Sequence, residues 1–113
     1  IIMGDLNGGP MDPSIKTGLS AGCTPSSEGL IDLMCLNQPV EHGSHQFNGH
    51  WEYLDQFIVS AQLLPLVGEA NAVWHETLLF NHPKFGPSPD KTYSGGRYKG
   101  GYSDHLPIVL RFK

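Results

Sequence analysis

The sequence contains no long hydrophobic run, and charged residues are few. No apolar stretch approaches the roughly 20 residues that a membrane-spanning helix requires. Charged residues make up 16% of the 113 residues, and the formal net charge is -4. This charge argues against binding of nucleic acid by bulk electrostatic attraction, although it leaves room for an enzyme that meets phosphate through a metal ion.

No basic and then apolar segment of the signal-peptide kind opens the sequence, and this observation says little about a leader. The sequence begins with Ile1 rather than Met, so we expect the natural N-terminus to lie upstream, and no compartment is indicated. With 39% hydrophobic residues, 14 glycines and 9 prolines, the composition is typical of one loop-rich globular domain.

Cysteine is scarce, and its spacing excludes a CxxC zinc or redox site. The two cysteines, Cys23 and Cys35, form one disulfide or stay as two reduced thiols. We favour free thiols, because a chain of this size can build a core without a cross-link.

Short apolar runs separated by turn residues predict a mixed α/β chain. The dipeptide Asn48-Gly49 is a strong hairpin signal, and Asp12 followed by Pro13 indicates a helix start. Pro107 places the last strand at an edge, or delays its pairing until after the proline. The expected strands are Ile1–Met3, His45–Phe47, Glu52–Ser60 and His105–Phe112, and the expected helices are Met11–Leu19 and Leu30–Leu36.

Polar side chains follow the first predicted strand in the segment "IIMGDLNGGP". Asp5 and Asn7 flank Leu6, so in an extended backbone both side chains point the same way. A carboxylate and a carboxamide on one face can hold a water and a phosphoryl oxygen side by side.

An acid and an imidazole stand together near the C-terminus, in "GGYSDHLPIVLRFK". Asp104 and His105 point apart in an extended segment, which favours two roles, with the carboxylate facing a metal ion and the imidazole facing the substrate. A third acid, Asp55, lies inside the apolar run "YLDQFIVS" and is costly to bury without a partner. We therefore expect His105 to hydrogen-bond Asp55 at roughly 2.6 to 3.2 Å.

These patterns predict one site at the ends of neighbouring strands. The strand ending at Asp5 and the strand beginning at His105 are expected to share one sheet, with Asp55 on a strand near His105. The predicted apolar interior contains Ile1, Ile2, Leu6, Phe57, Val59, Ile108 and Leu110.

Basic and aromatic residues alternate in "DKTYSGGRYKGGY". Such a mixture suits phosphate contact and ring stacking, and the candidate substrate contacts are Arg97, Tyr98, Lys99 and Tyr102. A solvated glycine-rich loop is the alternative reading. Another alternative is a zinc site at His42, His45 and His50, against which the intervening hairpin turn and the lack of cysteine count.

Taken in order, "IIMGDLN", "YLDQFIVS" and "YSDHLPIVL" resemble the closing half of the endonuclease/exonuclease/phosphatase superfamily, and the tail is similar to bacterial members. This superfamily includes pancreatic deoxyribonucleases, apurinic-site endonucleases, inositol-polyphosphate phosphatases and bacterial sphingomyelinases. Its Gly-Asp-x-Asn motif is matched by Gly4, Asp5 and Asn7. The resemblance implies that the acid orients or activates the attacking water, and that the amide holds the phosphate.

The superfamily's Ser-Asp-His motif is matched by Ser103, Asp104 and His105. The resemblance implies that Asp104 lies at the metal site together with Asp5, and that His105 contacts the scissile phosphate. Asp55 matches the strand aspartate that supports this histidine, although the polar residue that follows it departs from the usual pattern.

The resemblance also implies a fold, a cofactor and a substrate class. The fold is a four-layer α/β/β/α sandwich, and the cofactor is Mg²⁺ or Mn²⁺. The substrate is a phosphate ester in nucleic acid, inositol phosphate or a phospholipid headgroup.

The superfamily's first half, which supplies an Asn and a Glu metal ligand, has no match here. We therefore expect residues 1–113 to be the C-terminal portion of a larger domain that lacks its N-terminal half. Alone, such a fragment is expected to be inactive and to self-associate. The alternative is a binding module that kept the fold without catalysis.

Overall fold

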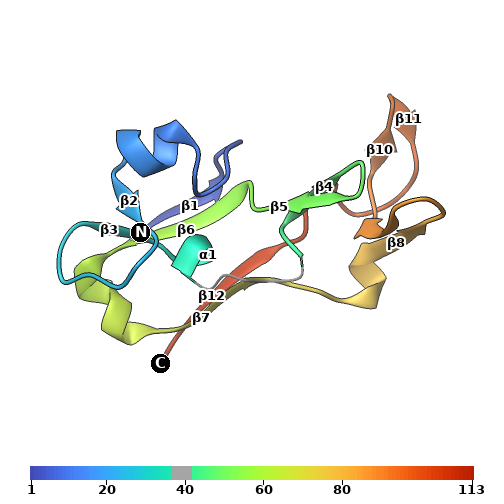
Figure 1. Ribbon diagram of the computed structural model, residues 1–113. Helices are drawn as coiled ribbons and strands as arrows, with labels where there is room; N and C mark the ends of the chain where they lie inside the picture. Colours follow the sequence, from blue (N-terminus) through green and yellow to red (C-terminus); the bar gives the residue numbers. More distant parts are fainter. Residues whose placement is uncertain (37–41) are drawn as a thin grey trace.

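The computed structural model describes residues 1–36 and 42–113, and it shows a mixed α/β protein with several small sheets and short helices. A four-stranded sheet forms one end of the molecule, and the hairpins that contain β8 and β10–β11 lie at the other end (Figure 1). No helix within the described residues is long and apolar enough to cross a membrane.

The four-stranded sheet has the order β1-β6-β3-β2. Its centre is β6 (Asp55–Ser60), which pairs antiparallel with β1 (Ile2–Asp5) on one side and with β3 (Leu30–Asp32) on the other. The short strand β2 (Ala21–Gly22) pairs parallel with β3. The run of apolar residues in β6 explains its central place, because a strand covered on both faces needs little alternation.

Two predicted helices are shorter than expected. Met11–Leu19 forms only one π-helical turn, η1 (Ser14–Gly18), and Asp12 Oδ1 accepts a hydrogen bond of 2.9 Å from the Ser14 amide at its start. The prediction for Leu30–Leu36 is wrong in its first part. Its first three residues form β3, and only α1 (Leu33–Leu36) is helical. The available edges of β2 and β6 explain the difference, because pairing on both sides overrides a weak helical pattern.

The predicted hairpin across Asn48-Gly49 is confirmed. It joins β4 (His45–Phe47) to β5 (His50–Glu52), and both turn residues have positive φ, at 50° and 85°. That conformation matches the turn that favours Asn-Gly in two-residue hairpins. The predicted strand Glu52–Ser60 is interrupted, because β5 ends at Glu52 and β6 begins at Asp55.

The C-terminal strand does not join the sheet of β1, so the single-sheet prediction is wrong. Instead, β12 (Ile108–Phe112) pairs antiparallel with β7 (Val67–Ala72), which follows the 3-10 helix η2 (Ala61–Leu66). Pairing begins directly after Pro107, which agrees with the loss of that residue's backbone donor.

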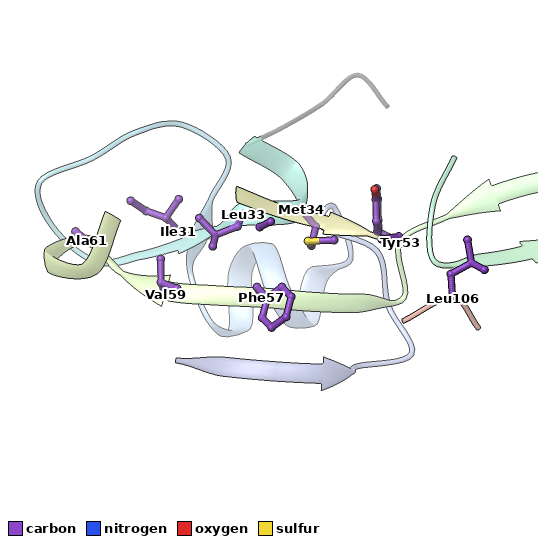
Figure 2. Packing of buried hydrophobic residues seen from close by; sticks show 10 residues of the cluster. Ile31, Leu33, Met34, Tyr53, Phe57, Val59, Ala61 and Leu106 are labelled. Atoms are coloured by element: carbon purple, nitrogen blue, oxygen red, sulfur yellow. The ribbon is translucent and has the colours of Figure 1, made fainter. Parts of the chain in front are cut away.

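The core consists of two clusters of buried side chains. The larger one joins β3, α1, β6 and β7, and Figure 2 shows part of it around β6. The smaller one contains Ile15, Ala21 and Ile58. Of the predicted interior residues, Phe57 and Val59 are buried, and Ile2, Leu6, Ile108 and Leu110 are half-buried against these clusters. Ile1 is 60% exposed, because it precedes the paired part of β1. The prediction that Ile1 lies in the apolar interior is therefore wrong.

Two further hairpins form the end of the molecule opposite the four-stranded sheet. The first joins β8 (Leu79–His82) to β9 (Gly86–Pro89), after the short helix η3 (Glu76–Leu78). The second joins β10 (Tyr93–Ser94) to β11 (Arg97–Tyr98).

Cys23 and Cys35 form a disulfide, so the expectation of free thiols is wrong. The bond links the loop after β2 to α1, with 5.1 Å between the two Cα atoms. The parallel pairing of β2 with β3 brings the following residues of both segments to the same end of the sheet, which places the thiols within bonding reach.

Candidate active site

The first part of the site lies where β1 ends and β6 begins. Asp5 and Asp55 are partners in the antiparallel register, and the pairing continues through a 2.9 Å hydrogen bond from the Leu6 amide to the Leu54 carbonyl. The Asp55 side chain is 15% exposed and that of Asp5 is 42% exposed. The site therefore has one sheltered carboxylate and one that is open to solvent.

His105 reaches these acids through a short connection to the hairpin β4–β5. It forms an isolated antiparallel bridge with His45, and the neighbouring Leu106 amide donates to the Ser44 carbonyl at 2.7 Å. Both Leu106 and Ser44 are buried, with exposures of 2% and 0%. This anchoring fixes the backbone of His105 beside β6, although β12 itself pairs elsewhere.

The predicted hydrogen bond between His105 and Asp55 is confirmed, with 2.6 Å between Nδ1 and Oδ2. An ionised carboxylate only accepts, so Nδ1 of the ring donates. The other ring nitrogen, Nε2, faces Asp5 with 3.9 Å to Oδ2. Asp55, His105 and Asp5 therefore form a line from the sheltered acid to the exposed acid.

Asp104 is exposed and lies beside the imidazole of His105 rather than beside Asp5. Ligand atoms of Asp104, His105 and His45 lie within 4.8 Å of one another, and a second such group consists of Asp5, Asp55 and His105. The two predicted metal ligands, Asp5 and Asp104, thus belong to different groups that share one histidine.

Asn7 does not have the extended backbone on which its predicted orientation depended. Its φ is 52°, and its amide donates to Asp5 Oδ1 at 2.9 Å. This local turn follows the end of β1, because Asp and Asn side chains readily close such turns and tolerate a positive φ. Asn7 is exposed next to the site, but it is not in line with the strand.

His45 is a site residue that the sequence pattern considered only as a zinc ligand. Its ring lies 4.8 Å from the ring of His105, measured between centroids, and its Nδ1 lies 3.4 Å from Glu52 Oε1. His45 and Glu52 are direct cross-strand partners in the hairpin. The sequence signal that could have identified the pairing of His45 with Glu52 is the Asn48-Gly49 turn, because this turn fixes which side chains of the two strands face each other.

The structure does not group the three histidines of the zinc alternative. Among the described residues, the groups that could hold a metal ion contain His45 but neither His42 nor His50. The ring of His42 instead lies against Trp74, with 4.4 Å between centroids.

The four predicted substrate contacts lie on or after the hairpin β10–β11 and are exposed to solvent. In the part of the chain that the structure describes, no hydrogen bond or ion pair joins them to the aspartates or to His105. Lys99 lines a surface pocket with residues of β4 and β8, whereas Tyr98 packs edge-on against Tyr93. The four predicted substrate contacts in question are Arg97, Tyr98, Lys99 and Tyr102.

The fold and the site define a mixed α/β protein that carries carboxylates and a carboxylate-bound imidazole at the ends of paired strands. The model of the endonuclease/exonuclease/phosphatase family matches residues 1–113. The chain belongs to this family, as its three motifs predicted. Members of the family are generally hydrolases that use a divalent metal. No curated protein and no solved structure matches the chain.

Proposed function

We propose that this chain carries catalytic groups of a divalent-metal-dependent phosphoesterase, which hydrolyses a phosphodiester or phosphomonoester bond by in-line attack of water. The observation that supports this most directly is the line of Asp55, His105 and Asp5, with distances of 2.6 and 3.9 Å along it. Family membership supports the same reaction class. Such an arrangement places an imidazole that can contact a phosphate next to a carboxylate that can hold a water.

Each residue has a distinct role in this proposal. Asp55 accepts a hydrogen bond from Nδ1–H of His105, and in the imidazolium form Nε2–H is then free to donate to an oxygen of the scissile phosphate. Asp5 accepts the hydrogen bond of the attacking water, and Asn7 holds a phosphoryl oxygen. The water oxygen bonds to phosphorus and gives up a proton to Asp5 while the ester P–O bond breaks, and the leaving oxygen takes up a proton from solvent water.

The exposed carboxylates fit a hard divalent cation. Asp5 and Asp104 are both open to solvent, and each lies within 4.8 Å of a ligand atom of His105. Mg²⁺ prefers carboxylate oxygens and retains several waters, so ligands at an open edge are suitable. We assign Asp104 and Asp5 as ligands of Mg²⁺ or Mn²⁺. When bound, the ion stabilises negative charge on the phosphoryl oxygens.

One apolar face of β1 supports the proposal that residues 1–113 are the C-terminal portion of a four-layer α/β/β/α sandwich. Ile1 and Met3 are 60% and 70% exposed, and alternation along the chain places them on the same face. β1 is also an edge strand of its sheet, so its free backbone groups can pair with a further strand. The N-terminal portion would cover this face and supply the remaining Asn and Glu ligands.

The test is hydrolysis by the full-length protein that contains this chain. DNA, RNA, inositol phosphates and phospholipids are offered with Mg²⁺ or Mn²⁺, and EDTA is added in parallel. We expect EDTA-sensitive turnover of at least one ester, and none by the 113-residue chain alone. Full-length protein that turns over none of them would refute the proposed activity and favour a binding module of the same fold.

A further inference from the structure

A concave pocket lies between the hairpins β4–β5 and β8–β9 and the segment that follows β9. Its volume of about 540 Å³ falls within the usual range of small-ligand pockets. Its walls combine three aromatic side chains, Phe47, Phe80 and Phe85, with two basic ones, Lys91 and Lys99. The proposed hydrolysis uses none of the aromatic residues.

The pocket adjoins the proposed active site along β4. His45 lies against His105, and Phe47 follows it two residues further on the same strand. Alternate residues of a strand point to the same face and are about 6.6 Å apart. The Phe47 side chain, which is 64% exposed, therefore lies on the same face of β4 as His45, whose ring contacts that of His105. A substrate group that is attached to a phosphate at His105 can therefore extend along β4 into the pocket.

The aromatic wall is held in place by its surroundings. His82 Nδ1 accepts a 3.2 Å hydrogen bond from the Phe85 amide, and the two rings stack with 4.9 Å between centroids. Gly49 at the tip of β4–β5 lies so close to Phe85 that an added Cβ would stand 3.1 Å from the ring. Gln46 Nε2 donates to the Pro87 carbonyl at 3.0 Å and ties the two hairpins together. Contacts within and between the two hairpins therefore hold the walls of the pocket in place.

The charge around the pocket is opposite to that of the whole chain. Four of the seven lysines and arginines lie between residues 84 and 99, and Asp90 is the only acid in that stretch. Asp90 and Ser88 also line the pocket and offer hydrogen-bonding groups next to the aromatic rings. The site therefore combines stacking surfaces, polar edges and local positive charge.

We infer that this pocket binds a nucleobase next to the scissile phosphate, and that the substrate class is single-stranded nucleic acid. This inference rests on the proposed function and narrows it. Bases stack on aromatic side chains, while lysines contact the backbone phosphates. An inositol ring has no flat π-face for the phenylalanines, and a base within a duplex cannot enter without leaving its stack.

The experiment measures binding of a fluorescein-labelled oligo-dT strand to the full-length protein that contains this chain, in EDTA, by fluorescence anisotropy. We expect Phe47→Ala and Phe80→Ala each to weaken binding at least tenfold, because each removes a stacking surface. Phe112→Ala is the matched control, since Phe112 on β12 is 49% exposed and Phe80 is 50% exposed. The control should bind like the parent, and circular dichroism checks that all variants are folded.

Competition identifies the substrate class. Inositol hexakisphosphate and vesicles of phosphatidylcholine with phosphatidylserine should displace the strand at least tenfold less well than unlabelled oligo-dT. Equal or better displacement by either would overturn the inference, as would absence of oligo-dT binding or an equal loss in Phe112→Ala.

The two proposals can fail separately, because EDTA prevents metal-dependent hydrolysis during the binding measurement. Base-dependent binding without any metal-dependent turnover by the full-length protein supports the pocket and refutes the proposed activity. Turnover of an inositol phosphate or a phospholipid without oligo-dT binding supports the activity and overturns the pocket.

Discussion

His105 Nδ1 lies 2.6 Å from Asp55 Oδ2, and this hydrogen bond joins residues that are 50 positions apart in the chain. Asp55 begins the central strand of the four-stranded sheet, whereas His105 precedes the strand that pairs with β7. The bond therefore joins the four-stranded sheet to the segment that leads into β12. It also gives a sheltered carboxylate its donor and holds one tautomer of an imidazole.

The first prediction concerns Asp55→Asn, which keeps the size of the side chain and removes its charge. We expect kcat of the full-length protein to fall by about 10- to 100-fold, because His105 loses the partner that fixes its tautomer. The Kd for Mg²⁺ should stay within about twofold. Glu28→Gln, a charge removal in an exposed loop, is the control and should leave kcat unchanged.

The same substitution can be followed in the isolated chain by NMR. The slowly exchanging Nδ1 proton of His105 should be visible in the parent and lost in Asp55→Asn. A signal that persists in the variant would contradict the role assigned to Asp55, whatever its effect on turnover.

The second prediction separates the metal ligand from the residue that orients the imidazole. Asp104→Asn should weaken Mn²⁺ binding at least about tenfold, because it removes one of few charged oxygen ligands. Asp55→Asn should change it little, since its carboxylate is engaged by His105. Electron paramagnetic resonance of free Mn²⁺ measures both. Equal weakening by the two variants would refute the division of roles.

Local signals in the sequence explain the parts of the fold that were predicted correctly. Asn48-Gly49 needs positive φ at both turn residues, so it fixes the hairpin without help from the rest of the chain. The partner of Asp55 was predictable because a carboxylate inside an apolar strand needs a donor, and the resemblance to the family pointed to His105. These inferences depend on chemistry that a single residue imposes.

Tertiary pairing explains the parts that were not predictable. The segment "VGEANA" of β7 alternates only small alanines with polar residues after a glycine, so its sequence does not identify it as the partner of β12. Leu30 and Ile31 lie in a strand rather than in the predicted helix, because they pair with β2 on one side and with β6 on the other. The disulfide depends on the approach of Cys23 to Cys35, which their spacing of 12 residues does not reveal.

The third prediction concerns this disulfide. Replacing both Cys23 and Cys35 by alanine should lower the free energy of unfolding by about 3 kcal/mol, because the cross-link restricts a short loop of the unfolded chain. Urea unfolding of parent and variant measures the difference. Treatment of the parent with a reducing agent should lower its stability by a similar amount and leave the variant unaffected. Equal sensitivity of both proteins to reduction would contradict the assignment.

The fourth prediction concerns Gly101, which lies just before the Ser-Asp-His motif. A Cβ there would overlap the backbone carbonyl of Asp90, the group that also accepts a 3.1 Å hydrogen bond from the Ser103 amide. Gly101→Ala should therefore destabilise the protein by about 1–3 kcal/mol and shift the motif. Gly9→Ala is the control, because its Cβ would meet only the Tyr53 carbonyl at 3.8 Å. Urea unfolding that shows equal stability for both variants would contradict this packing.

The last prediction concerns the pH dependence that Asp32 gives to folding. Burial raises the pKa of the Asp32 carboxyl, and the amides of Cys35 and Met34 oppose this only in part. Asp32 Oδ1 accepts from the Met34 amide at 2.9 Å, whereas Oδ2 is buried without a hydrogen-bond partner among the described residues. The folded protein therefore favours the neutral acid.

The sign of the effect follows from this preference. A carboxyl whose pKa is higher in the folded than in the unfolded state stabilises folding fully below about pH 3.9, the ordinary value of an aspartate. That stability is lost as the pH rises through the raised folded value. In Asp32→Asn the charge is absent at every pH, and the amide oxygen can still accept from the Met34 amide. The free energy of unfolding of Asp32→Asn relative to the parent should therefore increase as the pH rises from about 4 to 7. Urea unfolding across this range measures it, with Glu28→Gln as an exposed control, and parallel curves for Asp32→Asn and the parent would show that burial of Asp32 does not favour its neutral form.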